Sequence, residues 1–220
     1  MVDAALPLDI VPFVPEVESD ELETEIGLGE VLNAGVRLEA SAFNIEAHNV
    51  MTALETSGLP LISLYGAEGL CQESFYPTRF KRVYVPSERG IPFLSSSEII
   101  SLRPKTDNFL SRTQTIKIDA LFPQKWDILI SRSGTIGNIG LATDTFTDKA
   151  LSEHAIRIRA NDPDTAGYVV AFLRSRYGRP QLIQATYGSV VAQIEPEHLK
   201  RVVIPDLHTI RRIEIGRSMC

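Results

Sequence analysis

Short apolar runs separated by glycine and proline dominate the chain from residue 59 onward. These runs have the length of β-strands, and the glycines and prolines between them are typical of turns and loops. The runs that we assign to strands are residues 61–65, 82–85, 91–94 and 99–100. The pattern therefore predicts a domain rich in short strands.

The strongest strand signal lies at residues 127–131, where Ile128, Leu129 and Ile130 follow one another. A continuous apolar block of this length is typical of a strand that is covered on both faces. Gly134, Gly137 and Gly140 come next and allow backbone angles that a Cβ atom forbids. We predict a buried strand, a tight turn and a second strand.

Residues 151–159 alternate between apolar and polar side chains, which predicts a half-exposed strand. Three stretches predict helices instead. Residues 42–57 end at Gly58 and Pro60, and a second helix begins at the capping residue Asp164 and ends at Gly178 and Pro180. A third, residues 207–220, has apolar positions at near-helical spacing, and Arg174, Arg176 and Arg179 suit the C-terminal dipole of the second helix.

The net charge of −6 conceals two regions of opposite sign. Residues 1–60 hold twelve Asp or Glu and one Arg, whereas residues 61–220 hold twenty-one Lys or Arg and sixteen acids. We expect residues 1–25 to be a poorly ordered acidic leader that contains prolines. The remainder is basic enough to suit a nucleic-acid partner, although the same excess is also compatible with ordinary surface charge.

Two polar segments and the glycine turn carry the side chains that suit DNA. Lysine and arginine bind phosphates, and arginine and glutamine make paired hydrogen bonds to base edges. The candidates are Arg79, Lys81, Arg82, Arg103, Lys105, Arg112, Gln114, Arg132 and Ser133. For the first segment a plain strand edge, and for the second a solvated loop, are the alternative interpretations.

No catalytic or metal-binding pattern is present in the sequence. Ser152 and His154 lack a surrounding nucleophile turn, and the histidines lack metal-ligand spacing. Cys71 and Cys220 lie far apart, so we expect reduced thiols in a cytoplasmic protein and a buried Cys71. We expect no cofactor, no metal and no membrane-spanning segment.

Residues 127–137 and 151–159 resemble the target-recognition domain of the specificity subunits of type I restriction-modification systems. Other segments resemble the same family in the expected order, and the resemblance spans roughly residues 26–217. They are residues 37–40, residues 90–94 with 97–99, residues 168–176, and Gly188, Ser189, Gln193, Ile194, Leu199 and residues 202–205. Residues 205–210 depart from the proline-rich Glu-Gln ending of the family, which puts the spacer contacts in doubt.

This resemblance implies an α+β fold: a twisted mixed or antiparallel β-sheet recognition domain over residues 26–205, with short helices. Residues 206–220 would begin a C-terminal spacer helix, and Gly134 and Gly137 would be structural turns. The base-reading residues vary within the family, so none is transferred by position.

The resemblance also implies a non-catalytic protein, half of a specificity subunit, that recognises one half of a bipartite duplex DNA target. Its partners would be a DNA methyltransferase (modification) subunit and, through the complex, a restriction subunit, with a second recognition half as a further candidate.

Two other classes of function stay open from the residues alone. The chain is also compatible with a truncated protein-interaction module that binds a methyltransferase without gripping DNA. A small-molecule enzyme on a β-rich scaffold is the third interpretation, and a deep pocket with two titratable groups of shifted pKa would favour it.

Overall fold

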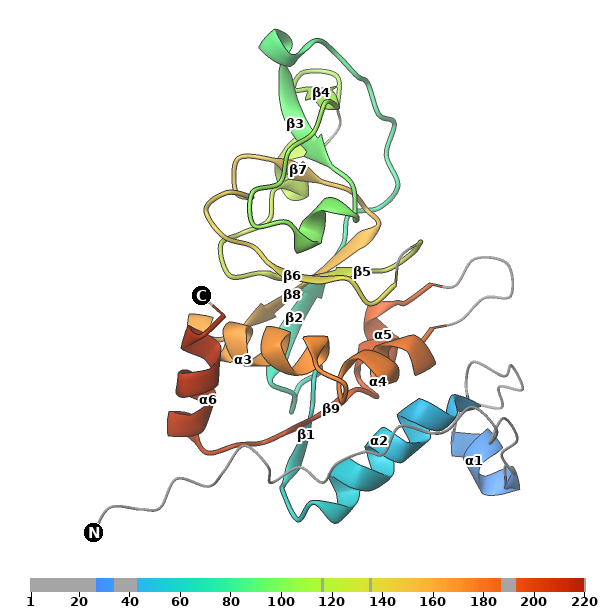
Figure 1. Cartoon of the computed structure of the whole chain (residues 1–220). Coiled ribbons are helices and arrows are strands. Elements are labelled where there is room, and N and C mark those ends of the chain that lie inside the picture. Colours follow the sequence, from blue (N-terminus) through green and yellow to red (C-terminus); the bar gives the residue numbers. More distant parts are fainter. Residues whose placement is uncertain (1–26, 34–42, 116, 135, 187–192, 220) are drawn as a thin grey trace.

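The computed structural model describes residues 27–33, 43–115, 117–134, 136–186 and 193–219. The acidic leader, residues 37–40 and the Gly188–Ser189 motif lie outside the described residues. The described part has an α+β fold in which helices lie on one side of a four-stranded sheet and a smaller sheet lies on the other (Figure 1).

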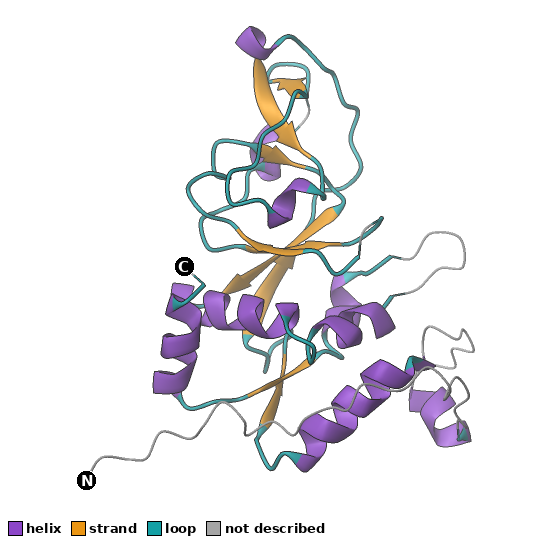
Figure 2. Cartoon of the chain, in the orientation of Figure 1, coloured by secondary structure: helices purple, strands orange, loops and turns teal. Residues whose placement is uncertain are grey.

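The β structure of the described residues consists of three small sheets (Figure 2). The four-stranded antiparallel sheet has the order β2-β8-β5-β6, with β2 Cys71–Phe75, β8 Ala155–Ala160, β5 Ile128–Ser131 and β6 Ile139–Leu141. In the second sheet, β3 Gly90–Leu94 pairs antiparallel with β4 Phe109–Ser111 and parallel with β7 Ala150–Leu151. The third is an antiparallel pair of β1 Leu61–Ser63 and β9 Val203–Pro205.

Six α-helices and three 3₁₀ turns complete the described part of the chain. The helices are α1 Leu28–Asn33, α2 Ile45–Thr56, α3 Pro163–Arg174, α4 Arg179–Gln184, α5 Pro196–Leu199 and α6 Thr209–Arg217. The 3₁₀ turns are η3 Ser87–Arg89, η4 Glu98–Ile100 and η5 Ile118–Leu121. None of the described helices has the length and hydropathy that a bilayer crossing requires.

The predicted buried strand is confirmed as β5, which lies between β8 and β6. Ile128 and Ile130 pack into the main core together with α3, whereas Leu129 points to the opposite side into a second apolar cluster. The turn that follows is also confirmed, because Gly134 and Gly137 have φ angles of 77° and 88°. Gly140 differs: it is a strand residue of β6, and a Cβ there would lie 1.9 Å from the carbonyl oxygen of Ile99.

The half-exposed strand predicted at residues 151–159 is wrong. Leu151 ends β7, a turn follows, and β8 begins at Ala155. Strand β8 pairs with β2 on one edge and β5 on the other. Its polar positions differ: Arg157 is only 6% exposed, whereas the Arg159 side chain is 41% exposed. The two terminal nitrogens of Arg157 donate to the carbonyl oxygens of Phe122 and Ala120 at 2.8 and 2.6 Å, whereas its buried Nε has no hydrogen-bond partner among the described residues.

Three other predictions for the β region need correction. Residues 99–100 form the 3₁₀ turn η4 rather than a strand, and the segment predicted as a long polar loop contains β4 and η5. Residues 82–85 are extended but form only an isolated bridge, between Tyr84 and Leu110. Strand β4 and the extended segment at residues 82–85 are both short, so local composition alone does not reveal their pairing partners.

The predicted helices are present, with shifted boundaries. Asp162, not Asp164, caps α3 by accepting a hydrogen bond from the Thr165 amide at 2.8 Å. Gly178 and Pro180 begin α4 instead of ending α3, as expected for proline in a first helical turn. Arg174 donates to the carbonyl oxygen of Ile139 in β6 and so links α3 to the sheet.

Candidate nucleic-acid interface

A cavity of about 520 Å³ opens where the loop after β2, the β5–β6 turn and the β7–β8 turn meet. Three of the residues that the sequence predicts as DNA contacts line it: Arg79, Arg82 and Arg132. The residues that line it are Tyr76, Pro77, Arg79, Phe80, Arg82, Arg132, Glu153, His154 and Gln193. We refer to it as the arginine cavity.

Arg132 enters the arginine cavity from the first position after β5. Its amide donates to the His154 carbonyl oxygen at 2.9 Å, and its own carbonyl oxygen accepts from Ile194 at 2.9 Å. The guanidinium carbon lies 4.6 Å from the ring centroid of Tyr76, and the guanidinium forms an ion pair with Glu195. The Tyr76 hydroxyl donates to the other oxygen of Glu195 at 2.6 Å, so the three side chains hold one another in place.

Arg82 lies on the opposite wall, in the loop between β2 and η3. Its Nη2 is 2.8 Å from Oε1 of Glu153, and its guanidinium carbon lies 5.2 Å from the ring centroid of Phe93. Burial alone would raise the pKa of Glu153, but the hydrogen bond and charge of Arg82 lower it below the usual value. Burial likewise opposes the charged form of Arg82, yet Glu153 raises the pKa of Arg82. Both groups are therefore charged at neutral pH.

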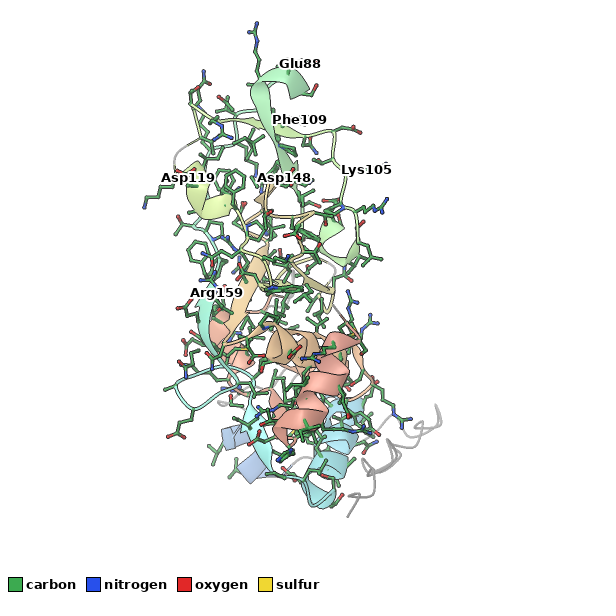
Figure 3. The ribbon with its side chains drawn as sticks, turned by 90° about the vertical axis from the view of Figure 1, so that its left-hand side faces the viewer. Glu88, Lys105, Phe109, Asp119, Asp148 and Arg159 are labelled. Carbon is green, nitrogen blue, oxygen red and sulfur yellow. The ribbon has the colours of Figure 1, made fainter. Side chains whose placement is uncertain are left out.

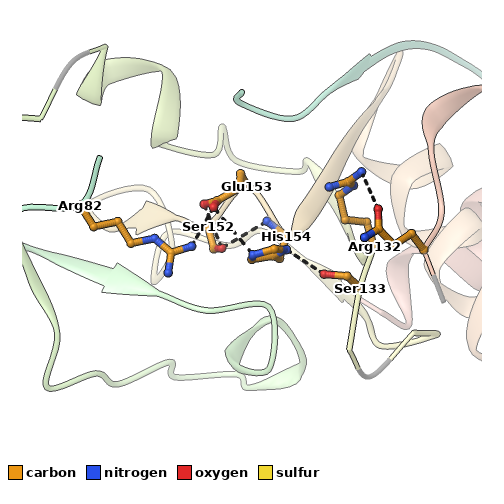
Figure 4. A network of polar contacts seen from close by, with 7 residues as sticks. Arg82, Arg132, Ser133, Ser152, Glu153 and His154 are labelled. Carbon is orange, nitrogen blue, oxygen red and sulfur yellow. Dashed lines mark hydrogen bonds and ion pairs between the residues drawn. The ribbon is translucent and has the colours of Figure 1, made fainter. Parts of the chain in front are cut away.

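The β7–β8 turn connects the two walls (Figure 4). Nδ1 of His154 lies 2.7 Å from Oγ of Ser133, and the His154 amide donates to Oγ of Ser152 at 3.2 Å. Nε2 of His154 is 3.7 Å from Oε1 of Glu153, which is beyond hydrogen-bond length. Because that oxygen is also bonded to Arg82, the Ser133–His154–Glu153 arrangement does not activate a serine nucleophile.

Several cationic side chains continue the surface beyond the arginine cavity. Arg79 lines it and is exposed, and Lys81 is exposed on the same loop. Arg112 follows β4, whose Ser111 amide donates to the Val83 carbonyl oxygen at 2.8 Å, so Arg112 lies beside this loop. Within the described ranges, these three cations form no ion pair.

Gln114 lies close to Arg112, in the turn directly after β4. Its amide donates to Oγ of Ser111 at 3.3 Å, which closes a turn directly after β4. Its side chain is exposed.

Arg103 and Lys105 do not join this surface. They lie in the loop between η4 and β4, which is fixed where Thr106 donates to the Phe93 carbonyl oxygen at 2.9 Å and Thr145 to that of Leu102 at 3.1 Å. Neither residue lines the arginine cavity, and Figure 3 shows Lys105 at the outer edge of the molecule. The predicted set of DNA contacts is thus divided between two places.

The sequence analysis missed the acidic partners of the arginines and the aromatic residues below them. Glu153 and Glu195 are separated from Arg82 and Arg132 by 71 and 63 residues. No local pattern links residues so far apart. The sequence offered one signal for these partners: Glu153 and His154 are adjacent within residues 151–159, which resemble a known family.

A second cavity, of about 220 Å³, is lined by two arginines, two carboxylates and Phe75. Arg159 lies 3.0 Å from both Asp127 and Glu73, and Arg157 lies over the Phe75 ring at 4.4 Å. The opposite charges are matched in number, so this cavity does not favour an anion.

The described residues contain no cluster of three His, Cys, Asp or Glu side chains that could hold a metal ion. Cys71 is buried, as the sequence predicts. Burial, with a smaller contribution from the charge of Asp162, raises the pKa of the Cys71 thiol to about 12, so it is neutral and unreactive at physiological pH.

No protein-family model and no curated protein matches the sequence. Solved structures do match. One is a chain of a type I R-M system described for its complex assembly and conformational transition, with 19% sequence identity and a TM-score of 0.51, covering 87% of this chain and 47% of that one. Another is the HsdS subunit from Thermoanaerobacter tengcongensis, with 19% identity and a TM-score of 0.50, covering 87% and 46%.

The chain spans about half the length of the structures that it matches. The segments that resemble the specificity subunits in sequence include β5, its turn and β8, which form the central sheet. Over most of its length, this chain has the fold of type I restriction-modification specificity subunits.

Proposed function

We propose that this chain recognises duplex DNA in a sequence-specific manner, as one recognition half of a type I restriction-modification specificity subunit. The observation that carries the proposal is the arginine cavity, with three arginines on its walls. Lys81, exposed on the same loop as Arg79, and Arg112, next to a residue bonded to that loop, add positive charge nearby. Neutralising phosphates with such side chains supplies most of the affinity of DNA-binding proteins.

The polar groups of this surface suit base recognition in addition to phosphate binding. Arginine and glutamine make paired hydrogen bonds to guanine and adenine edges in the major groove. Arg82, Gln114 and Gln193 offer these groups close to the cationic rim. Ser133, whose Oγ lies 2.7 Å from Nδ1 of the cavity residue His154, adds a further polar group.

An enzyme that acts on a small-molecule substrate is the less favoured interpretation. The arginine cavity does hold two titratable groups with shifted pKa, Arg82 and Glu153. Each shift stabilises the charged form, because the two groups form an ion pair with each other. A general acid at neutral pH needs the opposite shift, with the carboxyl pKa raised.

In this proposal the chain is not itself catalytic. It directs a DNA methyltransferase subunit, and through it a restriction subunit, to one half of a bipartite target. Helix α6 packs against α3, and in this proposal it is the first part of a spacer helix. The region over residues 26–205 is the recognition domain, and the function requires a cytoplasmic location where the DNA lies.

Selection from a randomised duplex library tests this proposal. The purified chain should enrich one short motif over successive rounds of binding and sequencing. The variant Arg79→Gln should bind the enriched duplex more weakly. Lys125→Gln is the matched control, because Lys125 is an exposed cation at the opposite end of β5 from Arg132 and should leave binding unchanged.

A library that shows no enrichment would contradict sequence-specific recognition. If the chain then captured a methyltransferase subunit while binding DNA only weakly, the protein-interaction module would be the better account.

A further inference from the structure

We infer that the three arginines of the arginine cavity have different roles, and that Arg82 is the one that discriminates between bases. This inference rests on the proposed function and extends it to single residues. The argument uses what each guanidinium already binds and how much of it stays accessible.

Arg132 has little capacity left for DNA. Its side chain is 13% exposed, Nη2 faces Glu195 and lies 3.4 Å from Oε1 of Gln193, and the Tyr76 ring covers one face. Its Nε is buried and has no hydrogen-bond partner among the described residues. Arg132 therefore ties the β5–β6 turn to the start of α5 and serves as a structural residue.

Arg79 differs in every respect. It is exposed, it lines the arginine cavity, and it forms no ion pair in the part of the chain that the structure describes. No described residue bonds to its guanidinium and fixes its direction. A phosphate accepts hydrogen bonds from many directions, so a cation of this kind suits the DNA backbone and carries no sequence information.

Arg82 combines a fixed orientation with access. Glu153 holds one edge of its guanidinium at 2.8 Å and the Phe93 ring lies below it, yet the side chain is 33% exposed. Tyr84 also interacts with the guanidinium through a side-chain hydrogen bond. Arginine has five N–H donors in a rigid fork, so N–H groups remain after the contacts with Glu153 and Tyr84. A fork whose direction is set in advance can select the O6 and N7 acceptors of guanine over other bases.

Glu153 is the positioning residue in this arrangement. Its side chain lines the arginine cavity but is only 8% exposed, and Oε1 is paired with Arg82. Its second oxygen lies 3.4 Å from Oγ of Ser152, so the carboxylate is also held within its own turn. The orientation of Arg82 therefore depends on a residue in the β7–β8 turn.

Library selection and salt titration with matched variants test this division. Arg82→Lys keeps the charge and removes the fork. It should reduce discrimination at a single G·C pair of the motif by about 5- to 150-fold, with an unchanged salt dependence. Arg79→Gln should weaken binding to all duplexes alike and lower the salt slope by roughly 0.9, with an unchanged motif. Arg132→Lys should lower the thermal unfolding temperature and leave the motif unchanged.

Glu153→Gln tests the positioning role. It should reduce discrimination at the same base pair as Arg82→Lys, and the double variant should lose no more than Arg82→Lys alone. Glu153→Asp, which keeps the charge, should restore part of the discrimination. Circular dichroism checks that each variant folds, and if the Glu153 variants do not fold, the comparison of Arg82→Lys with Arg79→Gln still decides.

The outcomes separate this inference from the proposed function. A motif that stays the same in Arg82→Lys, while the wild type enriches it, would overturn the role of Arg82 and leave DNA recognition standing. A loss of discrimination in Arg79→Gln would overturn the division as well. If the wild type enriches no motif, the proposed function itself fails.

Discussion

Gly167 of α3 and Gly216 of α6 meet backbone to backbone. A Cβ on Gly167 would lie 2.3 Å from the carbonyl oxygen of Gly216, and a Cβ on Gly216 would lie 2.0 Å from that of Asp164. The two helices can cross at this distance only because both positions lack a side chain. This contact holds α6 against the side of the domain, beside α3 (Figure 1).

Gly216→Ala should therefore lower the free energy of unfolding by about 1–3 kcal/mol, the usual cost of overpacking, because the helices must separate. Gly29→Ala is the matched control, since nothing lies within 4 Å of a Cβ at that helical position. Alanine there should leave stability unchanged or raise it slightly. Urea unfolding of both variants provides the measurement, and equal stabilities would contradict the close crossing.

Arg157 should be a stability residue, although it resembles a DNA-binding arginine in composition. Arg157→Ala leaves the carbonyl oxygens of Phe122 and Ala120 without their donor, so unfolding should require about 2–3 kcal/mol less. Lys125→Ala, which breaks only an exposed ion pair with Asp144, should change stability much less. A mild effect of Arg157→Ala on thermal unfolding would argue against the buried network.

Acid should weaken the fold in part through Glu153. The pKa of Glu153 is lowered in the folded protein, so the Arg82–Glu153 ion pair stabilises the fold above the ordinary value of 4.5. That contribution is lost as the pH falls through the lowered pKa of the folded state. Urea unfolding at about pH 7 and about pH 3.5 should therefore show a larger loss for the wild type than for Glu153→Gln. Identical losses in the two proteins would exclude this contribution.

Cys71 should resist alkylation in the native protein. Burial raises its pKa to about 12, so almost no thiolate forms at about pH 8. Iodoacetamide followed by peptide mass mapping should find Cys71 unmodified in native protein and modified in urea. Equal modification under both conditions would show that this thiol is accessible.

The strand β5 and its turn could be predicted because the signals are local. Three consecutive apolar residues indicate a strand covered on both faces, and Gly134 and Gly137 do have the positive φ angles that favour glycine. Strand β8 could not be predicted in the same way. Its arginines alternate with isoleucines, which is the pattern of a half-exposed strand. Only the tertiary structure, in which β8 lies between β2 and β5, reveals that Arg157 is buried.

The candidate site was predictable only as a set of cations. Arg79, Arg82 and Arg132 gather at one cavity, whereas Arg103 and Lys105 lie on a separate loop. Residue type indicated which side chains suit DNA, but their carboxylate partners are distant in sequence. Those partners decide which arginine is held and which stays accessible, so roles within the set required the structure.

The salt dependence of duplex binding tests the central claim most directly. Fluorescence anisotropy of a labelled duplex, titrated with the chain between about 50 and 200 mM salt, measures the number of phosphates that the protein neutralises. The account predicts that log K falls linearly with log salt, and that Arg79→Gln makes the slope shallower by roughly 0.9. Binding that is absent at low salt, or whose affinity does not change with salt, would contradict a cationic surface that grips DNA.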